Sequence, residues 1–512
     1  MISKAKSFGL LGLEAYPVEI EVDAANGLPA VTLVGLTDTA IKESKERVRS
    51  AIKNSGFQWP SQRITVNLAP SDIKKEGAHF DLAIALGILA STGQIDPVLL
   101  ENHVFLGELS LDGRIKPVRG ILAIGLAMAN TRMDNLVLPE GNSGEAEMVP
   151  HLSSWPQNNL KSTVQFLTDP LLKQYFKPAP TRQLKLNTDY EMDFSEVKGQ
   201  HFAKRALEVA VAGGHNIVLI GSPGSGKTML AKRIPTIMPS LTLKEALEIT
   251  KIHSAAGTIS DKNPLAGRRP FRSPHHSISD IALIGGGNIP RPGEISLAHY
   301  GVLFLDELPE FSRKALEALR QPLEESLICV SRIKHTMTFP ASFILVAALN
   351  PCPCGNYFNP HKACHCHPAK IKNYLGKISG PLMDRIDIHI EVPPVRHQEL
   401  FDNHEAEPSG KIRQRVEKAR SIQRERFRHD GIFQNSRMNG KLIKKYCSLD
   451  NQAQELLRIA ISELALSARA YDKILKVSRT ISDLSENNLI LAEHVAEAIQ
   501  YRSLDRDYGK LP

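Results

Sequence analysis

A glycine-rich loop set between a strand-like run and a helix-compatible run restricts the fold of this chain more than any other feature. Residues 216–220 are mostly apolar and branched, as in a short buried strand, and residues 229–233 are compatible with a helix. The loop between them consists of Gly221, Ser222, Pro223, Gly224, Ser225, Gly226, Lys227 and Thr228. Glycines in such a loop let backbone N–H groups face phosphate oxygens, and the helix N-terminus adds a positive dipole. The order of strand, loop and helix predicts an α/β fold with a P-loop.

Two residues of this loop carry chemistry that the turn itself does not require. The ammonium group of Lys227 is expected to neutralise the β- and γ-phosphates of a nucleotide, and the hydroxyl of Thr228 is expected to help hold Mg²⁺. The alternative is a glycine-rich turn without a ligand, but such a turn would not need a strand before it and a helix after it. ATP and Mg²⁺ are therefore the predicted cofactors.

Two further strand-like runs end in polar residues that suit the same site. Residues 302–305 lead into Asp306 and Glu307, the arrangement of a Walker B element. In such an element Asp306 would orient the Mg²⁺ shell, and Glu307 would polarise the attacking water. Residues 343–349 end at Asn350, which corresponds to the sensor 1 position of AAA+ proteins. A surface acidic pair and a turn asparagine are the alternatives, and the order of P-loop, Asp-Glu and Asn favours the nucleotide site.

Length and charge restrict the remaining possibilities. A chain of 512 residues exceeds what one hydrophobic core supports, so two or three domains are expected. We place them at residues 1–176, 195–395 and 411–512, joined by linkers at 177–194 and 396–410 that are polar and contain proline. No apolar run is long enough to cross a membrane, and the N-terminus lacks a signal-peptide pattern, so a cytoplasmic protein is expected. The net charge of +8 favours a polyanionic partner.

The first and the last of these domains differ in their patterns. In the N-terminal domain, strand-like residues 18–22 and 64–68 alternate with a helical segment at residues 80–92, which predicts an α/β sandwich. In the C-terminal domain, apolar residues recur at helical spacing over residues 453–466 and 488–499. We therefore expect the C-terminal domain to be all-α.

Four of the six cysteines fall close together, at Cys352, Cys354, Cys364 and Cys366. Two C-x-C pairs separated by nine residues supply four thiolates for a closed tetrahedral zinc site. The spacing within each pair is shorter than usual, and His361, His365 and His367 are alternative ligands. Without a metal, these would be reduced or redox-sensitive thiols. The cluster predicts a structural zinc that stiffens the loop after Asn350.

Beyond these motifs, the sequence resembles the YifB/ComM family of magnesium-chelatase-like AAA+ ATPases over essentially its whole length. The resemblance rests on residues 213–216 (Gly-Gly-His-Asn), 269–277 (Arg-Pro-Phe-Arg-Ser-Pro-His-His-Ser), 285–287 (Gly-Gly-Gly) and 380–387 (Gly-Pro-Leu-Met-Asp-Arg-Ile-Asp). It implies an AAA+ core with a helical lid and a homo-oligomer in the form of a hexameric ring. It also implies branch migration of DNA during natural transformation, in which a member of the family is implicated.

The same resemblance implies catalytic roles for two arginines. Arg385 looks like the arginine finger, which would reach the γ-phosphate bound by a neighbouring subunit and stabilise the charge developed in hydrolysis. Arg469 looks like the sensor 2 arginine of the C-terminal lid. An ordinary salt-bridged or exposed arginine is the alternative for each. The role of Arg385 implies that ATP sites lie at subunit interfaces.

Residues 104–115 of the N-terminal domain resemble the Lon protease domain, whose fold is of the ribosomal S5 domain 2 type. Residues 77–81 (Gly-Ala-His-Phe-Asp) hold no serine where that family places its nucleophile. Residues 117–124 lack the lysine that would activate one. The resemblance therefore implies a non-proteolytic domain that serves assembly or DNA contact.

Two segments of the central domain have the composition of surface loops. The stretch between Lys227 and Asp306 is longer than a compact nucleotide core needs, so it is expected to hold an insertion that includes the glycine triplet. Apolar and polar residues alternate over residues 328–336, which predicts a hairpin that offers Arg332 and Lys334 to a polyanion. A solvated strand face would produce the same alternation.

Three functions fit these motifs: an ATP-driven DNA translocase or branch-migration helicase, a magnesium-chelatase subunit, and a protein-remodelling ATPase. The basic residues 411–420 and 424–428, together with the family resemblance, favour DNA, although a solvated lid helix accounts for the same charges. No integrin-type metal-binding domain is present to support a chelatase. The loops that could face the pore of a ring, residues 285–287 and 328–336, are glycine-rich or basic. A protein-remodelling enzyme needs hydrophobic pore loops. A DNA motor is the predicted function.

Overall fold

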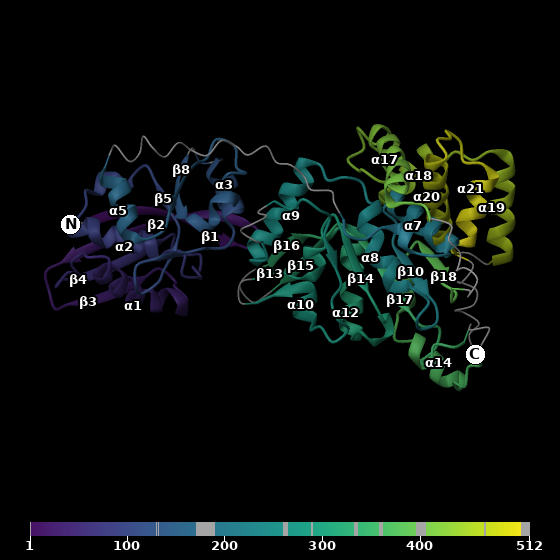
Figure 1. Ribbon diagram of the computed structural model, residues 1–512, viewed down its shortest axis with the longest axis horizontal. Coiled ribbons are helices and arrows are strands. Elements are labelled where there is room, and N and C mark those ends of the chain that lie inside the picture. Colours follow the sequence, from purple (N-terminus) through teal and green to yellow (C-terminus); the bar gives the residue numbers. More distant parts are fainter. Residues whose placement is uncertain are drawn as a thin grey trace. The chain divides into compact units, whose positions relative to one another are not determined.

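The computed structural model describes residues 2–129, 131, 133–169, 190–259, 265–287, 290–331, 336–357, 362–395, 406–464 and 467–502. The chain divides into two compact units (Figure 1). The N-terminal unit comprises Met1–Leu186 and Ala246–Ala266, and the C-terminal unit comprises Asn187–Glu245 and Gly267–Pro512. The residues expected to form the nucleotide core and the lid thus fall in one unit, apart from Ala246–Ala266. Within the described ranges, no helix has both the length and the apolar character needed to cross a membrane.

The N-terminal unit is built on a mixed sheet with the strand order β3-β4-β2-β1-β5-β8-β9. Its strands are β1 (Ile2–Leu11), β2 (Glu14–Ala25), β3 (Ala30–Val34), β4 (Arg63–Ala69), β5 (Val104–Phe105), β8 (Asn135–Pro139) and β9 (Ser153–Gln157). The helices around it include α1 (Thr39–Asn54), α2 (Asp81–Ser91), α3 (Ile121–Ala129), α4 (Ser143–Ala146) and α5 (Leu160–Thr168). Every residue of α2 is buried, and this helix packs on β1 and β2. The predicted strands at 18–22 and 64–68 and the predicted helix at 80–92 are confirmed.

A segment from the middle of the chain belongs to the N-terminal unit. Helix α9 (Leu243–Ala256) carries most of this segment, Ala246–Ala266. Its Leu247 and Leu265 pack against a small apolar cluster formed by Leu122, Met148 and Val149. The hydroxyl of Ser254 donates a hydrogen bond of 2.5 Å to Glu145 Oε2. Part of the insertion expected between Lys227 and Asp306 therefore completes the N-terminal unit.

The C-terminal unit contains a parallel sheet with the strand order β11-β14-β17-β10-β18. Its strands are β10 (Ile217–Ile220), β11 (Phe271–Arg272), β14 (Val302–Leu305), β17 (Ile344–Leu349) and β18 (Ile388–Glu391). Strands β10, β14 and β17 are apolar throughout and fully buried, because a parallel sheet is covered by helices on both faces. Ile217 of β10 is in register with Val346 of β17 and Ile388 of β18. All three predicted strands of the nucleotide core are thus confirmed.

Helices and short hairpins surround this sheet. Helix α7 (His201–Gly213) precedes β10, and α8 (Lys227–Ile237) follows the P-loop. The remaining helices before the lid are α10 (Asp280–Ile284), α11 (Glu294–Leu297), α12 (Arg313–Ala318), α13 (Arg320–Glu325), α14 (Pro368–Leu375) and α15 (Gly380–Met383). Strands β12 (Gly285–Gly286) and β13 (Arg291–Pro292) pair antiparallel, as do β15 (Leu327–Ser331) and β16 (Thr336–Pro340). The hairpin expected at 328–336 is confirmed, whereas Arg332 and Lys334 lie outside the described residues.

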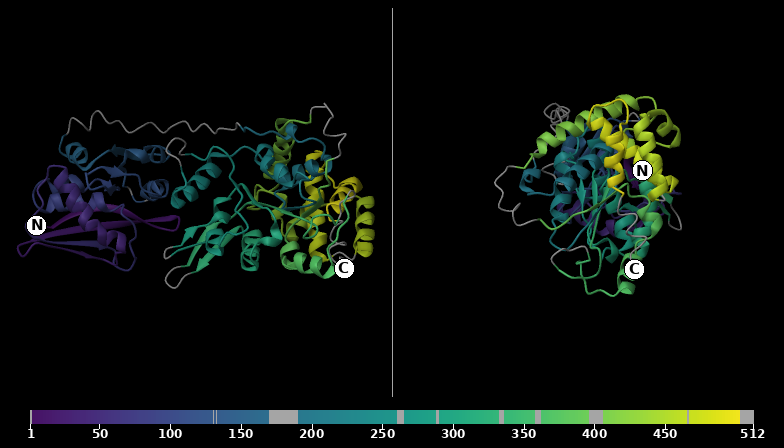
Figure 2. Two further views of the ribbon diagram at one scale, coloured as in Figure 1. Left: turned by 60° about the horizontal axis from the view of Figure 1, so that its bottom comes forward. Right: turned by 90° about the vertical axis from the view of Figure 1, so that its right-hand side faces the viewer.

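The helices within residues 409–500 form a lid and gather on one side of the C-terminal unit (Figures 1 and 2). They are α17 (Ser409–Arg426), α18 (Gly440–Tyr446), α19 (Asn451–Leu464), α20 (Ala468–Leu484) and α21 (Ala492–Gln500). The helix predicted at 453–466 is confirmed as far as residue 464, beyond which residues 465 and 466 lie outside the described residues. The helix predicted at 488–499 is wrong at its start. It begins only at Ala492, because Ile490 forms a parallel bridge with Leu449 and Leu491 is extended.

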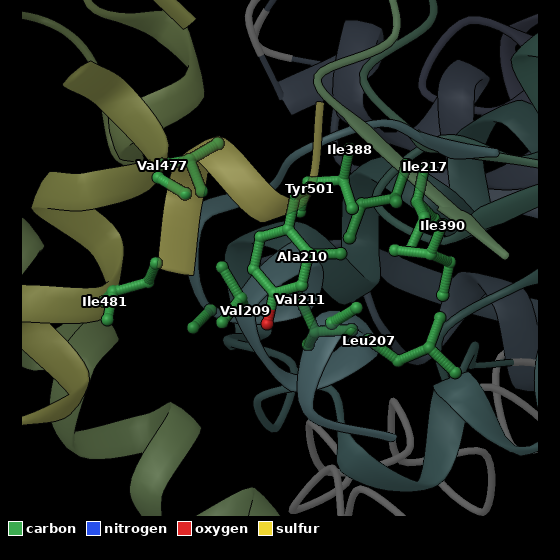
Figure 3. Packing of buried hydrophobic residues seen from close by; sticks show 14 of the residues in the cluster. Leu207, Val209, Ala210, Val211, Ile217, Ile388, Ile390, Val477, Ile481 and Tyr501 are labelled. Atoms are coloured by element: carbon green, nitrogen blue, oxygen red, sulfur yellow. The ribbon is translucent and has the colours of Figure 1, made fainter. Parts of the chain in front are cut away.

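The lid and the sheet share one hydrophobic core (Figure 3). Helix α7 lies between the strands and the lid. The packed side chains include Leu207, Val209, Ala210 and Val211 of α7, Ile217, Ile388 and Ile390 of the sheet, Val477 and Ile481 of α20, and Tyr501. The ring of Tyr501 is fully buried, and its hydroxyl donates a hydrogen bond of 2.8 Å to Glu497 Oε1. Three residues separate the end of helix α7 from β10, so the lid packs against the helix that leads into the P-loop strand.

Replacement of Phe304 in β14 tests the packing of this sheet. Phe304 is 1% exposed and stacks on Phe271 with ring centroids 6.0 Å apart. Phe304→Ala should lower the free energy of unfolding of the C-terminal unit by about 3–5 kcal/mol. Phe433→Ala removes the same atoms from a side chain that is 69% exposed, and it should change this free energy by less than about 0.5 kcal/mol. Urea unfolding of both full-length variants measures the difference, and equal losses would contradict the packing.

Candidate active site

The loop between β10 and α8 has the conformation that its glycines predict. Gly224 and Gly226 have φ angles of +78° and +91°, which residues with a side chain rarely adopt. Gly221 has no room for a side chain, because a Cβ atom there would lie 2.3 Å from the backbone oxygen of Val392. The backbone of the loop is thus free to curl, and the N-terminus of α8 points its unpaired N–H groups toward the loop.

Lys227 reaches back across this loop. Its Nζ donates hydrogen bonds to the backbone oxygens of Gly221, at 2.7 Å, and Ser222, at 3.0 Å, and to Asn350 Oδ1, at 3.2 Å. Burial lowers the pKa of Lys227, while the nearby carboxylates of Asp306 and Glu307 act in the opposite direction. The predicted P-loop lysine and the predicted sensor 1 asparagine are therefore in direct contact.

The ends of the neighbouring strands supply the acidic side of the site. Thr228 Oγ1 donates a hydrogen bond of 2.7 Å to Asp306 Oδ2, which joins the start of α8 to the end of β14. Glu307 follows with a φ angle of +53° and an exposed side chain. Because β10, β14 and β17 are parallel neighbours, their carboxyl ends bring Lys227, Thr228, Asp306 and Asn350 to one edge of the sheet.

A contact to Glu307 was missed by sequence reasoning. His276 Nδ1 lies 3.4 Å from Glu307 Oε2, and the ring of His275 lies 4.0 Å from that of His276. Two histidines in a polar loop gave no specific signal, although they belong to the family motif at residues 269–277. The structure thus places this motif beside the proposed catalytic carboxylate.

The site fits a magnesium–nucleotide complex. Ser225 Oγ is buried and has no hydrogen-bond partner in the part of the chain that the structure describes. The hydroxyl of Thr228 and the carboxylate of Asp306 are oxygen donors of the kind that Mg²⁺ prefers. Lys227, the loop N–H groups and the helix N-terminus together provide the positive charge that phosphates require.

The two arginines are brought together elsewhere. Arg385 lies between α15 and β18, forms an ion pair with Glu324, and donates a hydrogen bond of 2.6 Å to the backbone oxygen of Pro381. Arg469 is the second residue of α20. Both line a pocket of about 310 Å³, to which Arg437, Lys473 and Lys476 also contribute. The described residues that line this pocket include no member of the P-loop.

The four cysteines form one cluster. All four sulfur atoms lie within 4.8 Å of one another, with Cys352 Sγ 3.3 Å from Cys354 Sγ and 3.6 Å from Cys364 Sγ. Zinc–sulfur bonds of about 2.3 Å would place tetrahedral ligands about 3.8 Å apart, so the arrangement fits zinc. Among the alternative ligands, His367 instead caps α14 by accepting from the N–H of Ala369, and His361 lies outside the described residues.

The cysteine loop also touches the P-loop. Gly355 follows Cys354 with a φ angle of +77°, and a Cβ atom on it would lie 2.2 Å from Pro223 Cδ. Cys352 itself is fully buried. A metal bound by these thiolates would therefore brace the P-loop as well as the residues after Asn350.

The basic stretch of the lid is only partly available to a ligand. In α17, Arg415 pairs with Glu208 and Glu407, and Arg426 pairs with Asp483. Arg420 donates to Gln434 Oε1 at 2.9 Å. Other cations of this stretch are exposed, namely Lys411, Lys418, Arg424 and Arg428. The basic residues 411–420 and 424–428 thus divide into exposed cations, to which the predicted DNA contact is restricted, and arginines whose ion pairs connect α17 to α7 and α20.

Residues 77–81, where the Lon protease family places its nucleophilic serine, include a carboxylate with a structural role. Asp81 is fully buried, forms an ion pair of 2.9 Å with Arg47, and accepts a hydrogen bond from Ser44. His79 is partly buried, and this burial lowers the pKa of its imidazole to about 4, which leaves it neutral. Ser44 and Arg47 lie on α1, so their contacts with Asp81 fasten α2 to α1.

Comparison with known proteins agrees with this arrangement. A family model described as magnesium chelatase, subunit ChlI, matches residues 193–400. A second, described as subunit ChlI of Mg-chelatase, matches residues 20–142. A third, described as the C-terminal part of magnesium chelatase subunit ChlI, matches residues 406–502. The three models together span the P-loop, both arginines and the lid.

Individual relatives cover nearly the whole chain. Competence protein ComM of Haemophilus influenzae is 44% identical over 506 residues, which are 98% of this chain and 97% of the relative. YifB of Escherichia coli is 40% identical over 497 residues, which are 97% of this chain and 96% of the relative. A magnesium-chelatase 67 kDa subunit of Chlorobaculum parvum is 24% identical over 208 residues, only 40% of this chain and 27% of that protein. The chain therefore belongs to the YifB/ComM family of magnesium-chelatase-like AAA+ ATPases.

Proposed function

We propose that this ATPase assembles as a hexameric ring and moves DNA, acting as a branch-migration helicase or translocase during natural transformation or recombination. The observation that carries the ring is the division of the site: Arg385 and Arg469 line a pocket that includes no P-loop residue. In this proposal the pocket of one subunit faces the nucleotide of the next. The domains at 1–176, 195–395 and 411–512 are the functional divisions of the subunit.

Each catalytic group has a specific task in this scheme. Magnesium-bound ATP supplies the phosphoryl group whose transfer to water drives the ring. Glu307 orients the attacking water, Asn350 contacts the same region from the end of β17, and Lys227 holds the phosphates. Arg385 of the neighbouring subunit stabilises the charge that develops on the transferred group, and Arg469 supports it. Phosphoryl transfer needs positioning and charge stabilisation more than covalent chemistry, which suits residues held at strand ends.

The case for DNA rests on the family and on surface charge. The first relative is named a competence protein, and its similarity extends over 98% of this chain. The exposed lid cations Lys411 and Arg424 are placed to meet phosphates. Two antiparallel hairpins of the C-terminal unit, β12–β13 and β15–β16, are candidate contacts to a DNA strand in the ring. The chelatase alternative is supported by the family models, but the magnesium-chelatase subunit named above matches only 40% of this chain.

The cysteine cluster is proposed to hold a structural zinc ion. Its four sulfur atoms are mutually within 4.8 Å, and its loop contacts Pro223 of the P-loop through Gly355. In this role the thiolates of Cys352, Cys354, Cys364 and Cys366 bind the ion and keep the turn after Asn350 rigid.

The test of the DNA motor is the ATPase rate of the full-length protein with no DNA, single-stranded DNA and a branched junction. We expect binding and stimulation by DNA that decline as salt is raised, because phosphate contacts release counterions. Phosphate release must disappear in Glu307→Gln, which assigns the measured rate to this site. If DNA neither binds nor stimulates at low salt, the proposed function is wrong.

Two substitutions separate nucleotide binding from hydrolysis. Lys227→Ala removes a charged donor and should weaken ATP binding by about 10–100-fold. Glu307→Gln should retain binding but lower kcat by about 10²–10⁴-fold, because the group that orients water is lost. Fluorescent-nucleotide titration and phosphate release measure the two effects. Lys232→Ala and Glu310→Gln alter exposed residues of the same elements and should change neither. Normal turnover by Glu307→Gln would refute its role.

The zinc proposal predicts one zinc ion per chain. Protein purified without chelators should contain stoichiometric zinc by mass spectrometry, and Cys354→Ser should lower this content, because one thiolate is lost. Cys329→Ser is the matched control, since Cys329 lies exposed in β15 and outside the cluster. A preparation without stoichiometric zinc would exclude the metal.

A further inference from the structure

Two family motifs are not explained by the residues discussed so far: Gly-Gly-His-Asn at 213–216 and the Asp that ends residues 380–387. We propose that Asp387 is a positioning residue, which holds Arg385 and Arg469 in one fixed arrangement through its contacts with His215 and Lys473. The proposal rests on the proposed function, in which both arginines serve the nucleotide of a neighbouring subunit.

The first contact joins Asp387 to the segment before the P-loop strand. His215 is fully buried, and its Nδ1 lies 3.1 Å from Asp387 Oδ2. The other ring nitrogen, Nε2, lies 2.8 Å from the hydroxyl of Thr480 on α20. Gly213 leaves the space for this ring, because a Cβ atom there would lie 2.2 Å from His215 Nε2. The glycine and the histidine of this motif are therefore needed together.

The second contact joins Asp387 to the lid helix that carries Arg469. Lys473 Nζ lies 3.1 Å from Asp387 Oδ1 and donates a hydrogen bond of 3.0 Å to the backbone oxygen of Ile386. Lys473 follows Arg469 by four residues on α20, so the two side chains lie on the same face of the helix. Thr480 lies two turns farther along that face. Asp387 thus fixes α20 at two points, directly through Lys473 and through His215.

The third set of contacts fixes the backbone that carries Arg385. The backbone oxygen of Asn216 accepts hydrogen bonds from the N–H groups of Asp387, at 3.0 Å, and Ile388, at 3.1 Å. Asn216 Nδ2 donates to the backbone oxygen of Arg385 at 3.4 Å, and its Oδ1 accepts from the N–H of Leu345 at 2.9 Å. Asn216 directly precedes β10, whose other end is the P-loop. One strand therefore connects a subunit's own P-loop to the arginine that serves its neighbour.

The charge on Asp387 is what makes it effective. Burial would raise the pKa of this carboxyl, but the positive charge of Lys473 and the hydrogen bond from His215 hold it well below its ordinary value. Burial also lowers the pKa of Lys473, so the loss of the carboxylate would leave a buried ammonium without its counter-charge. The lid helix and the Arg385 segment would then no longer be fastened to each other.

The kinetic test begins with Asp387→Asn, which keeps the shape but removes the charge. We expect kcat for ATP to fall about 10²-fold, the effect of misplacing a charge-stabilising group by about 1 Å, with KM changed less than about twofold. Asp483→Asn is the matched control, because Asp483 is also buried and ion-paired. It lies on α20, the helix of Lys473, and its partners are Arg426 and Arg479. It should leave kcat unchanged. Wild-type kcat in Asp387→Asn, or an equal loss in Asp483→Asn, would overturn the proposal.

Mixing of variants shows where Asp387 acts. Asp387→Asn subunits retain their own Lys227 and Glu307, whereas Glu307→Gln subunits retain an intact Arg385 pocket. If Asp387 serves the neighbouring site, mixed rings should hydrolyse ATP about tenfold faster than either variant alone, because some interfaces become complete. Lys473→Gln, which removes the charge from the other side of the pair, should behave in the same way.

Arg385→Ala mixed with Glu307→Gln separates this inference from the function on which it rests. If that pair recovers hydrolysis and Asp387→Asn does not, Asp387 is not a positioning residue for the neighbouring site. If the Arg385→Ala pair fails to recover as well, the interface site itself is wrong, and the inference falls with it.

Discussion

The parallel register of β14, β17 and β10 is the constraint on which the rest of the C-terminal unit depends. Parallel strands end at one edge, so the P-loop, Asp306 and Asn350 meet there although Lys227 and Asn350 are 123 residues apart along the chain. Buried apolar residues on both faces of the sheet hold that edge in place. The hydrogen bonds from Lys227 to Asn350 and from Thr228 to Asp306 follow from this register.

The same sheet also supports a second site, the pocket that Arg385 and Arg469 line. Strand β18 pairs with β10 on the side away from β17, and Arg385 lies just before β18. The lid helix α20 brings Arg469 to the same pocket. A single chain thus carries a nucleotide-binding edge and a pocket with both arginines in one unit, and our proposal joins the two between subunits. The shared strand β10 offers a short physical connection from one to the other, because it is buried and hydrogen-bonded on both sides.

Sequence patterns predicted local chemistry well where one segment carries the whole signal. The P-loop, the strand before Asp306 and the cysteine cluster each depend on spacing within about 15 residues, and the structure has all three as expected. The predicted start of α21, at residue 488, was wrong, because a long-range bridge between Ile490 and Leu449 overrides local helical periodicity. The contact of His276 with Glu307 was missed for a similar reason, since nothing local distinguishes that histidine.

The amino-acid sequence by itself determined the identity of the nucleotide-binding motifs, their strand–loop–helix order and the four clustered thiols. Backbone freedom at Gly224 and Gly226 and the apolar character of the strands are local properties, so the sequence alone is enough to predict them. Only the tertiary structure decided that Ala246–Ala266 packs with the N-terminal unit, that much of the basic α17 stretch is tied up in ion pairs, and that Asp387 joins His215 to Lys473. Each of these three findings depends on contacts between residues far apart in sequence. Such contacts form only in the folded chain, where burial and charge determine which residues pair.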